Sequence, residues 1–258
     1  MILPLRVELM KLRATGLTYG LLATAVGLSA LLAVLAAAQA GSNVAPLSTA
    51  SGLGTVTTTT GLALLLAAIL GVTVASGEFR HQTATLTYLS FPDRNRVLAA
   101  KAMAAAAAGA VYGFAAGVAA TVVGLIAVAI KGDSVALSAG TLLAHMGGAA
   151  LGAALLAAAG VGVGSLVRGE LGAVIGTIAW VVVIELIIGG LFRSIQPYLP
   201  YTAATTLAGI KLGQSLLVVR VAAGPQPLPF AAATGLLLAV AAVVAFAAAL
   251  ATVPRDIT

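Results

Sequence analysis

Six long runs of apolar residues, joined by shorter polar stretches, constrain the fold of this chain more than any other feature. The runs cover about residues 16–38, 57–77, 102–130, 138–167, 171–192 and 229–253. About 20 helical residues cross the hydrocarbon core of a bilayer, which is about 30 Å thick. Lipid offers no hydrogen-bond partner to an open backbone, so each run is predicted to be helical. The sequence therefore predicts an all-α polytopic membrane protein with six transmembrane helices.

Composition excludes a soluble protein. The 258 residues are 61% hydrophobic and only 8% charged, whereas soluble domains average about 45–50% apolar and about 25% charged residues. No stretch has the composition of a soluble appendage, so residues 1–258 are predicted to form a single transmembrane domain. The chain has no Cys, which excludes disulfides and Cys-based metal sites.

The basic residues predict how the chain is oriented. Nine of the thirteen Lys and Arg residues lie on the side of the N-terminus if all six runs cross the membrane, and cytoplasmic segments carry such an excess. Both termini are therefore predicted to be cytoplasmic, and the net charge of +6 requires no nucleic-acid partner. Residues 38–40 resemble a signal-peptidase site, but the apolar run before them is longer than the about 7–15 residues of a signal peptide. We expect this run to be retained as a span.

Residues 1–15 are predicted to form a short interfacial helix that lies in contact with lipid at the inner membrane surface. Apolar residues recur there at helical spacing, at Ile2, Leu5, Leu9 and Leu12. Polar side chains occupy other positions around the helix: Arg6, Glu8, Lys11 and Arg13. The alternative is a basic tail that only sets the topology.

The segment 78–101, between the second and third runs, is the most charged part of the chain and is predicted to face the cytoplasm. Ser90 and Asp93 have capping-box spacing, with Pro92 in the first turn, so a helix is predicted to start there and to continue into the third span. Residues 79–89 fit either one face of a helix or an extended strand with alternating Thr residues. We favour a short helix, because two spans flank the segment closely.

The segment 193–228 precedes the sixth run on the outer side. Four Pro residues fall within it, at positions 197, 200, 225 and 227, and Pro229 follows directly, while Lys211, Gln214 and Arg220 interrupt its apolar middle. The segment is too polar for an ordinary span, so a re-entrant helical hairpin that dips into the outer leaflet is predicted. Tyr198 and Tyr201 would suit the aromatic belt of the interface.

Motifs of known catalytic sites are absent from the sequence. The chain contains no G-x-x-x-x-G-K-[ST] phosphate loop, no H-E-x-x-H and no G-x-S-x-G. The chain is therefore not expected to be an enzyme or to bind a cofactor or a metal itself.

Glu185 is the one acidic residue inside a predicted span. An acid at mid-helix costs about 3 kcal/mol on insertion scales, so its carboxylate should avoid lipid. It could line a transport pathway or a subunit seam, or it could be a structural acid paired with Arg193 or with another span. In the fourth span, His145 is expected to be a hydrogen-bonded packing residue. The pairs Gly148/Gly152 and Gly160/Gly164 predict close helix packing within one subunit.

The cytoplasmic segment resembles a motif of the ABC-2 type permease family, the membrane-spanning subunits of type V ABC exporters. In that family the second span ends with Glu-x-x-x-Gly-Thr, followed by Pro-x-x-Arg and by a Lys that enters the third span. The matching residues are Glu78, Thr83, Pro92 and Lys101, with Arg94 and Arg96 as a basic pair, whereas Gln82 replaces the family's Gly. Residues 8–13 also look like the family's entry helix.

This resemblance implies a permease subunit of an exporter in the bacterial plasma membrane. Two ABC ATPase subunits would bind ATP and Mg²⁺ and would dock on the cytoplasmic side, and a second permease, identical or paralogous, would complete the transporter. The ATPase-coupling residues implied are Glu78, Phe79, Arg80, His81, Gln82, Thr83, Pro92, Arg94, Arg96 and Lys101. The substrate expected from the family's breadth is a small amphipathic compound such as a drug, a peptide or a lipid-like molecule.

Two other classes of function remain open at this stage. An ion-coupled secondary transporter would show more intramembrane ionisable groups and broken helices near mid-membrane. A non-transport membrane protein, such as an assembly factor or an immunity protein, would lack an ATPase partner.

Overall fold

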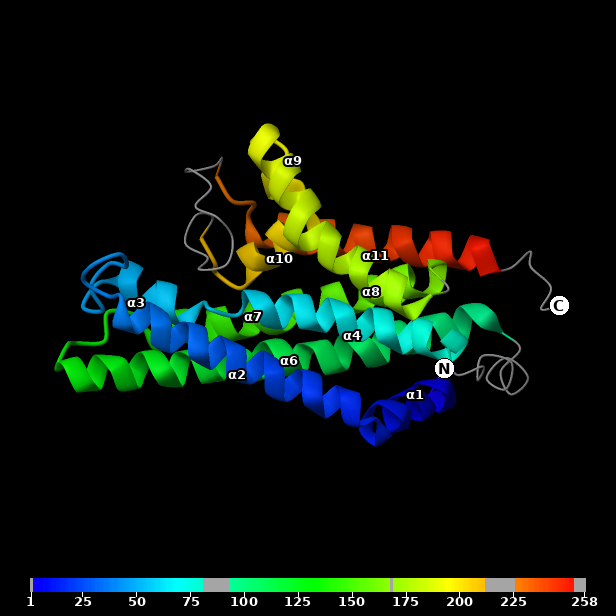
Figure 1. The fold of residues 1–258 in the computed structure, drawn as a ribbon, viewed down its shortest axis with the longest axis horizontal. Coiled ribbons are helices and arrows are strands. Elements are labelled where there is room, and N and C mark those ends of the chain that lie inside the picture. Colours follow the sequence, from blue (N-terminus) through cyan, green and yellow to red (C-terminus); the bar gives the residue numbers. More distant parts are fainter. Residues whose placement is uncertain (1, 81–92, 168, 212–225, 253–258) are drawn as a thin grey trace.

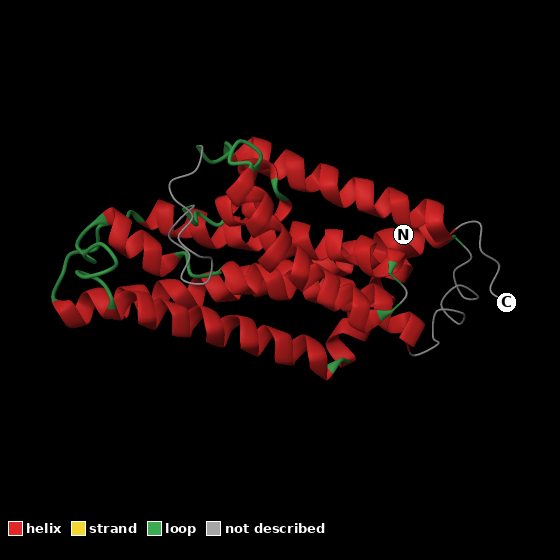
Figure 2. Cartoon of the chain, turned by 45° about the horizontal axis from the view of Figure 1, so that its top comes forward, coloured by secondary structure: helices red, strands yellow, loops and turns green. Residues whose placement is uncertain are grey.

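The computed structural model describes residues 2–80, 93–167, 169–211 and 226–252. The described part is helical and contains no β-strand (Figure 2). Its elements are α1 (Ile2–Ala14), α2 (Gly16–Ala38), α3 (Ala50–Thr57), α4 (Gly61–Arg80), α6 (Arg94–Lys131), α7 (Ala139–Leu166), α8 (Glu170–Ala179), the π-helical turn η1 (Trp180–Ile184), α9 (Glu185–Leu191), the 3₁₀ turn η2 (Gln196–Tyr198), α10 (Pro200–Leu207) and α11 (Phe230–Thr252).

Six helical segments of the described residues are long and apolar enough to cross a membrane, as the sequence predicts. They are Gly16–Ala38, Ala50–Gly77, Arg94–Lys131, Ala139–Leu166, Glu170–Leu191 and Phe230–Ala251. The protein is therefore a multi-pass membrane protein. The helix α1 and the last turn of α11 lie at one end of the bundle, here called the terminal end (Figure 1). The helix α3 and the last turn of α6 lie at the opposite end, here called the far end (Figure 1).

The helix α7 lies at the centre and packs against α6, α4, α11 and α10. Glycine makes these approaches possible. A Cβ atom added to Gly160 would lie 2.3 Å from the carbonyl oxygen of Ala68 on α4, and one added to Gly113 of α6 would lie 2.1 Å from that of Ala149 on α7. The two small-residue pairs of α7 both act within the chain, because Gly160 and Gly164 face α4 while Gly148 and Gly152 face α10. The prediction of close intrasubunit packing is confirmed.

The second span differs from the prediction. It starts at Ala50 rather than near residue 57, and it is interrupted at residues 58–60 between α3 and α4. Thr58 ends α3 with φ −107° and ψ 20°, and its hydroxyl donates to the Gly54 carbonyl (2.8 Å). The Thr59 hydroxyl donates to the carbonyl of Ser29 on α2 (3.0 Å). Threonine hydroxyls compete for backbone carbonyls in this way, which explains why a run of Thr residues interrupts the helix.

The third span is one uninterrupted helix of 38 residues, α6. At about 1.5 Å per residue it is about 57 Å long and extends beyond a hydrocarbon core of about 30 Å. The helix starts three residues later than predicted, because Asp93 rather than Ser90 is its N-cap. The Asp93 carboxylate accepts a hydrogen bond from Arg96 N (3.2 Å). Ser90 and Pro92 lie outside the described residues.

The segment 193–228 contains η2 and α10 in its described part. The helix α10 packs against α7, α11 and α4, and Ala203 and Ala204 are fully buried. The return limb of the predicted re-entrant hairpin falls on residues 212–225, which lie outside the described residues. Tyr198 is 58% exposed, as an interfacial residue would be. Tyr201 instead packs against the main core cluster.

Candidate functional site

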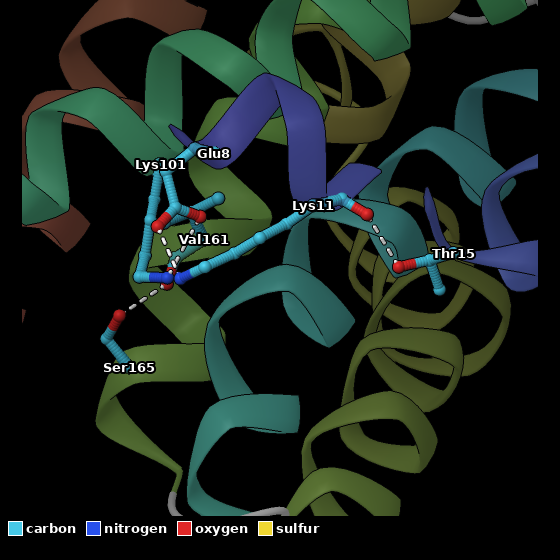
Figure 3. Close-up of polar contacts among 6 residues, drawn as sticks. All are labelled: Glu8, Lys11, Thr15, Lys101, Val161 and Ser165. Carbon is cyan, nitrogen blue, oxygen red and sulfur yellow. Dashed lines mark hydrogen bonds and ion pairs between the residues drawn. The ribbon is translucent and has the colours of Figure 1, made fainter. Parts of the chain in front are cut away.

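A buried ionic cluster, here called the Glu8 cluster, joins the first helix to the third span. The Glu8 carboxylate contacts two ammonium groups, Lys101 Nζ at 3.1 Å and Lys11 Nζ at 2.9 Å (Figure 3). The side chains of Glu8 and Lys101 are each 5% exposed, whereas that of Lys11 is 41% exposed. Removing one partner of such a buried pair leaves an uncompensated charge and costs about 3–5 kcal/mol. The cluster therefore ties α1 firmly to the beginning of α6.

Local structure brings these three residues together. Lys11 follows Glu8 by three residues, so the two side chains share one face of α1. The helix α1 ends at Ala14, and the Thr15 hydroxyl closes its last turn by donating to the Lys11 carbonyl (2.7 Å, Figure 3). Leu12 is buried in a core cluster that includes Leu70 of α4 and Ala104 of α6. The leucine face of α1 thus packs against the bundle, and it holds Glu8 opposite Lys101.

The other predicted coupling residues surround this place in the chain. Arg94 and Arg96 lie in the first turn of α6, where Arg96 Nε pairs with Asp93 at 2.8 Å. Glu78, Phe79 and Arg80 form the last turn of α4, and nothing is described of their side chains. His81, Gln82, Thr83 and Pro92 lie outside the described residues. Arg6 and Arg13, which the sequence assigned to an interfacial helix, lie on α1 and are exposed. The structure therefore unites one predicted coupling residue, Lys101, with two from the predicted interfacial helix, Glu8 and Lys11.

The second polar site, here called the Glu185 junction, connects the fifth span with α10. Glu185 is 5% exposed. Its carboxylate accepts hydrogen bonds from Tyr201 N (2.8 Å) and Thr202 N (3.1 Å), from the Thr202 hydroxyl (3.3 Å) and from the Trp180 indole (3.2 Å). The ion pairs of the described residues include none between Glu185 and Arg193, so of the alternatives left open by the sequence this pairing is not found. The partner of Glu185 is a helix N-terminus.

The sequence around α10 explains why Glu185 is needed there. The N-cap residue is Leu199, which has no side-chain acceptor, and Pro200 follows as the first helical residue. The N–H groups of Tyr201 and Thr202 would otherwise lack a capping acceptor. A carboxylate also interacts favourably with the positive end of a helix dipole. Glu185 thus caps α10 from a different span. A sequence signal for this contact exists, because Leu199 and Pro200 start a helix without a capping side chain. This signal was not used in predicting the partner of Glu185 from the sequence.

Tyr201 extends the junction to the second span. Its hydroxyl donates to the carbonyl of Gly61, the first residue of α4 (2.9 Å). Burial and the nearby Glu185 carboxylate raise the pKa of the Tyr201 phenol. The phenol therefore keeps its proton and acts as a donor. Sequence reasoning missed this role and assigned Tyr201 to the membrane interface.

The break in the second span is a third polar region. Thr57, the last residue of α3, is hydrogen-bonded to His145 Nδ1 (3.3 Å), which confirms the predicted packing role of His145. Other span hydroxyls, such as those of Ser76 and Thr177, donate to a carbonyl one turn earlier in their own helix. In contrast, the buried hydroxyls of Ser29, Thr60 and Thr121 have no hydrogen-bond partner within the described part.

The described residues contain no group of three or more His, Cys, Asp or Glu that could hold a metal ion. The described polar sites join helices to one another. Comparison with protein-family models and with curated proteins found no match for this chain.

Proposed function

We propose that this chain is the transmembrane subunit of an ATP-driven ABC exporter in the bacterial plasma membrane, with both termini in the cytoplasm. It works with a second permease subunit, and two copies of a separate ATPase subunit bind ATP and Mg²⁺ and supply the energy. The exported compound is small and amphipathic, such as a drug, a peptide or a lipid-like molecule. The six apolar spans and the motif in residues 78–101 support this proposal.

The observation that carries the proposal is the buried pair between Glu8 and Lys101. The ATPase would dock on the segment between α4 and α6, and it would push on the start of α6. Lys101 lies in the second turn of that helix, and its ammonium group is paired with α1. A displacement of α6 would therefore also move α1. The Glu8 cluster is well placed to convert a local push into a movement of two membrane helices.

The proposal is tested by co-expressing the chain with an ATPase subunit encoded by a neighbouring gene. We expect the two proteins to co-purify and the complex to hydrolyse ATP and to export an amphipathic dye from inverted vesicles. Glu8→Gln should lower the ATP-driven dye flux by roughly tenfold, equivalent to about 1.4 kcal/mol in the activation barrier. Arg13→Gln on the same helix is the matched control and should retain the flux. Failure to co-purify, or equal flux in both variants, would contradict the proposal.

An ion-coupled secondary transporter is the second candidate, and the interruption of the second span favours it. Broken helices form ion sites in such transporters, and the unpartnered hydroxyls of Ser29, Thr60 and Thr121 belong to the break and to neighbouring helices. The scarcity of acidic side chains inside the spans argues against an ion-coupled transporter, since the Glu185 carboxylate already accepts hydrogen bonds from the start of α10. Dye transport driven by a sodium or proton gradient without ATP would favour this candidate over the exporter.

A further inference from the structure

The fifth span has the lowest share of buried residues among the six spans of the described chain, slightly below the 17% of the sixth. Within its 18-residue apolar window only 11% of the residues are buried, compared with 61% in the second span and 56% in the fourth. Its first half, α8, packs against α4 and α7, whereas α9 has its main contacts only with the neighbouring turns η1 and η2. Figure 1 shows α9 leaning away from the rest of the bundle. The second half of this span is therefore held by few side-chain contacts.

The two halves of the span meet at an irregular turn. Residues Trp180–Ile184 form the π-helical turn η1, and none of them is buried. A π-helical turn replaces the usual hydrogen bonds with longer i→i+5 bonds, and such turns are frequent at functional sites. The indole of Trp180 donates to Glu185, which is five residues later. The turn provides a place at which α9 can change direction relative to α8.

The Glu185 junction is the principal polar attachment of α9 to the core. Three of its four hydrogen bonds come from Tyr201 and Thr202 at the start of α10. The helix α10 is itself firmly held, because Leu207 O would lie 1.8 Å from a Cβ atom on Gly148 of α7. Beyond this junction, Gly189 of α9 packs on the side chain of Gln196. The carboxylate thus joins a weakly packed element to a rigid one.

We propose that Glu185 is a latch that holds the outer half of the fifth span against α10. When the latch releases, α9 swings from the π-helical turn away from α10, and the proposed export requires this movement. This inference rests on the proposed transport function only for the reason why α9 would move. The latch and the hinge are properties of this chain alone.

The second span supplies a route by which the latch is controlled. The Tyr201 hydroxyl connects the start of α10 to Gly61, the first residue of α4. From Gly61 the helix α4 runs 20 residues, about 30 Å, to Arg80 beside the coupling segment. A pull on α4 would reach the two residues whose N–H groups bind Glu185. Tyr201→Phe should therefore preserve the latch and weaken its response to ATP.

The test measures the position of α9 directly and needs neither ATPase nor substrate. The chain has no Cys, so Leu191→Cys and Ile130→Cys give two unique spin-label sites. Their wild-type side chains are 72% and 80% exposed. Ile130 is a fixed reference, because the neighbouring Lys131 donates to the Ala37 and Ala40 carbonyls (3.3 and 3.2 Å). Double electron–electron resonance of the full chain in nanodiscs then reports the distance between the labels.

We expect one narrow distance distribution with Glu185 present. Glu185→Gln should raise the population of a longer distance roughly tenfold, the effect of losing about one charge-assisted hydrogen bond. Glu170→Gln, which removes the acid at the opposite end of the same span, is the matched control and should leave the distribution narrow. A folded Glu185→Gln protein with the wild-type distribution would overturn the latch. Glu185→Ala is a second variant for the same measurement. If it does not fold, the distance distribution of the nearly isosteric Glu185→Gln variant alone tests the latch.

A disulfide between α9 and η2 tests the same movement by its effect on export. A Cβ atom at Gly189 would lie 3.5 Å from that of Gln196, within the range of about 3.5–4.5 Å that disulfides span. Oxidised Gly189→Cys/Gln196→Cys should stop export, and a reductant should restore it. Export that continues with the disulfide intact would contradict the gating role. A failed exporter proposal would instead abolish ATP-driven flux in every variant while leaving the spin-label distances readable.

Discussion

At the scale of single residues, two buried carboxylates are stabilised by different partners. Glu8 is paired with ammonium groups, so its partners lose charge–charge attraction when it is replaced. Glu185 is bound by N–H and O–H donors, mainly from one helix terminus. A buried charge is tolerated only when it is paired or fully hydrogen-bonded. These two residues are therefore where single substitutions should have the largest effects.

The Glu8–Lys101 pair can be tested by a double-mutant cycle. Glu8→Gln and Lys101→Met should each lower the free energy of unfolding in detergent by about 3 kcal/mol, because each leaves a buried partner uncompensated. The double variant should lose less than the sum of the two, since no unpaired charge remains from this contact. Thermal or denaturant unfolding measures the three values. Strict additivity would mean that the pair contributes no coupling.

The predicted coupling role of Glu78 and Arg80 at the end of α4 is tested by function rather than by stability. Glu78→Gln and Arg80→Gln should impair ATP-coupled transport while leaving membrane insertion intact, because both residues belong to the segment on which the ATPase would act. Arg193→Gln, an exposed basic residue in the segment after the fifth span, serves as the control. Vesicle flux and membrane fractionation are the measurements. Normal flux in both coupling variants would count against the proposed role of this segment.

At the scale of elements, the glycines of α7 differ in how closely a neighbouring helix approaches them. A Cβ atom on Gly160 would lie 2.3 Å from the Ala68 carbonyl oxygen and 3.0 Å from Val72 N, both on α4. A Cβ atom on Gly147, in the same helix, would have nothing within 4 Å. The same substitution is therefore expected to have opposite effects at the two sites.

Gly160→Ala should destabilise the protein by about 1–3 kcal/mol, because the backbones of α4 and α7 must separate. Gly147→Ala should be neutral or should stabilise it by up to about 1 kcal/mol, the difference in helix propensity between Gly and Ala. Thermal unfolding in detergent compares the two variants. Equal melting temperatures would mean that α4 and α7 do not approach as closely as described.

The interruption of the second span illustrates what element boundaries depend on. Hydropathy indicated a span in this region, and the structure has one. Its start at Ala50 and its break at residues 58–60 were not predicted. The break depends on Thr hydroxyls that donate either to their own helix or to Ser29 on another, and the start depends on Thr49, whose hydroxyl accepts from Gly52 N. The spacing of apolar residues in one segment does not show which carbonyl a Thr hydroxyl will bond to.

At the scale of the whole molecule, the bundle surrounds α7 and leaves the fifth span at its periphery. The rigid part contains the closely packed helices α4, α6, α7 and α10. The helix α1 is attached to this part by a buried ion pair, and α9 is attached to it by a carboxylate. Two polar contacts thus connect outlying helices to the closely packed centre.

The proposed orientation can be tested with single cysteines, because the chain has none of its own. Asn95→Cys at the start of α6 and Asn43→Cys in the α2–α3 connection replace exposed residues near opposite ends of the bundle. A membrane-impermeant maleimide added to intact cells should label Asn43→Cys and spare Asn95→Cys, as the excess of basic residues on the terminal side predicts. The reverse pattern would place the coupling segment outside the cell and would remove the basis for an ATPase partner.

Hydropathy and segment length were enough to predict a helical membrane protein with six spans, and the described residues confirm both features. Length and apolarity decide this, because lipid leaves a backbone no alternative to internal hydrogen bonding. The partners of the two buried carboxylates, in contrast, became visible only in the packed helices. Glu8 and Lys101 are 93 positions apart, and Glu185 reaches an N-terminus that follows a separate turn. Partner choice between distant segments depends on how the helices pack, and a linear pattern of apolar and polar residues does not encode it.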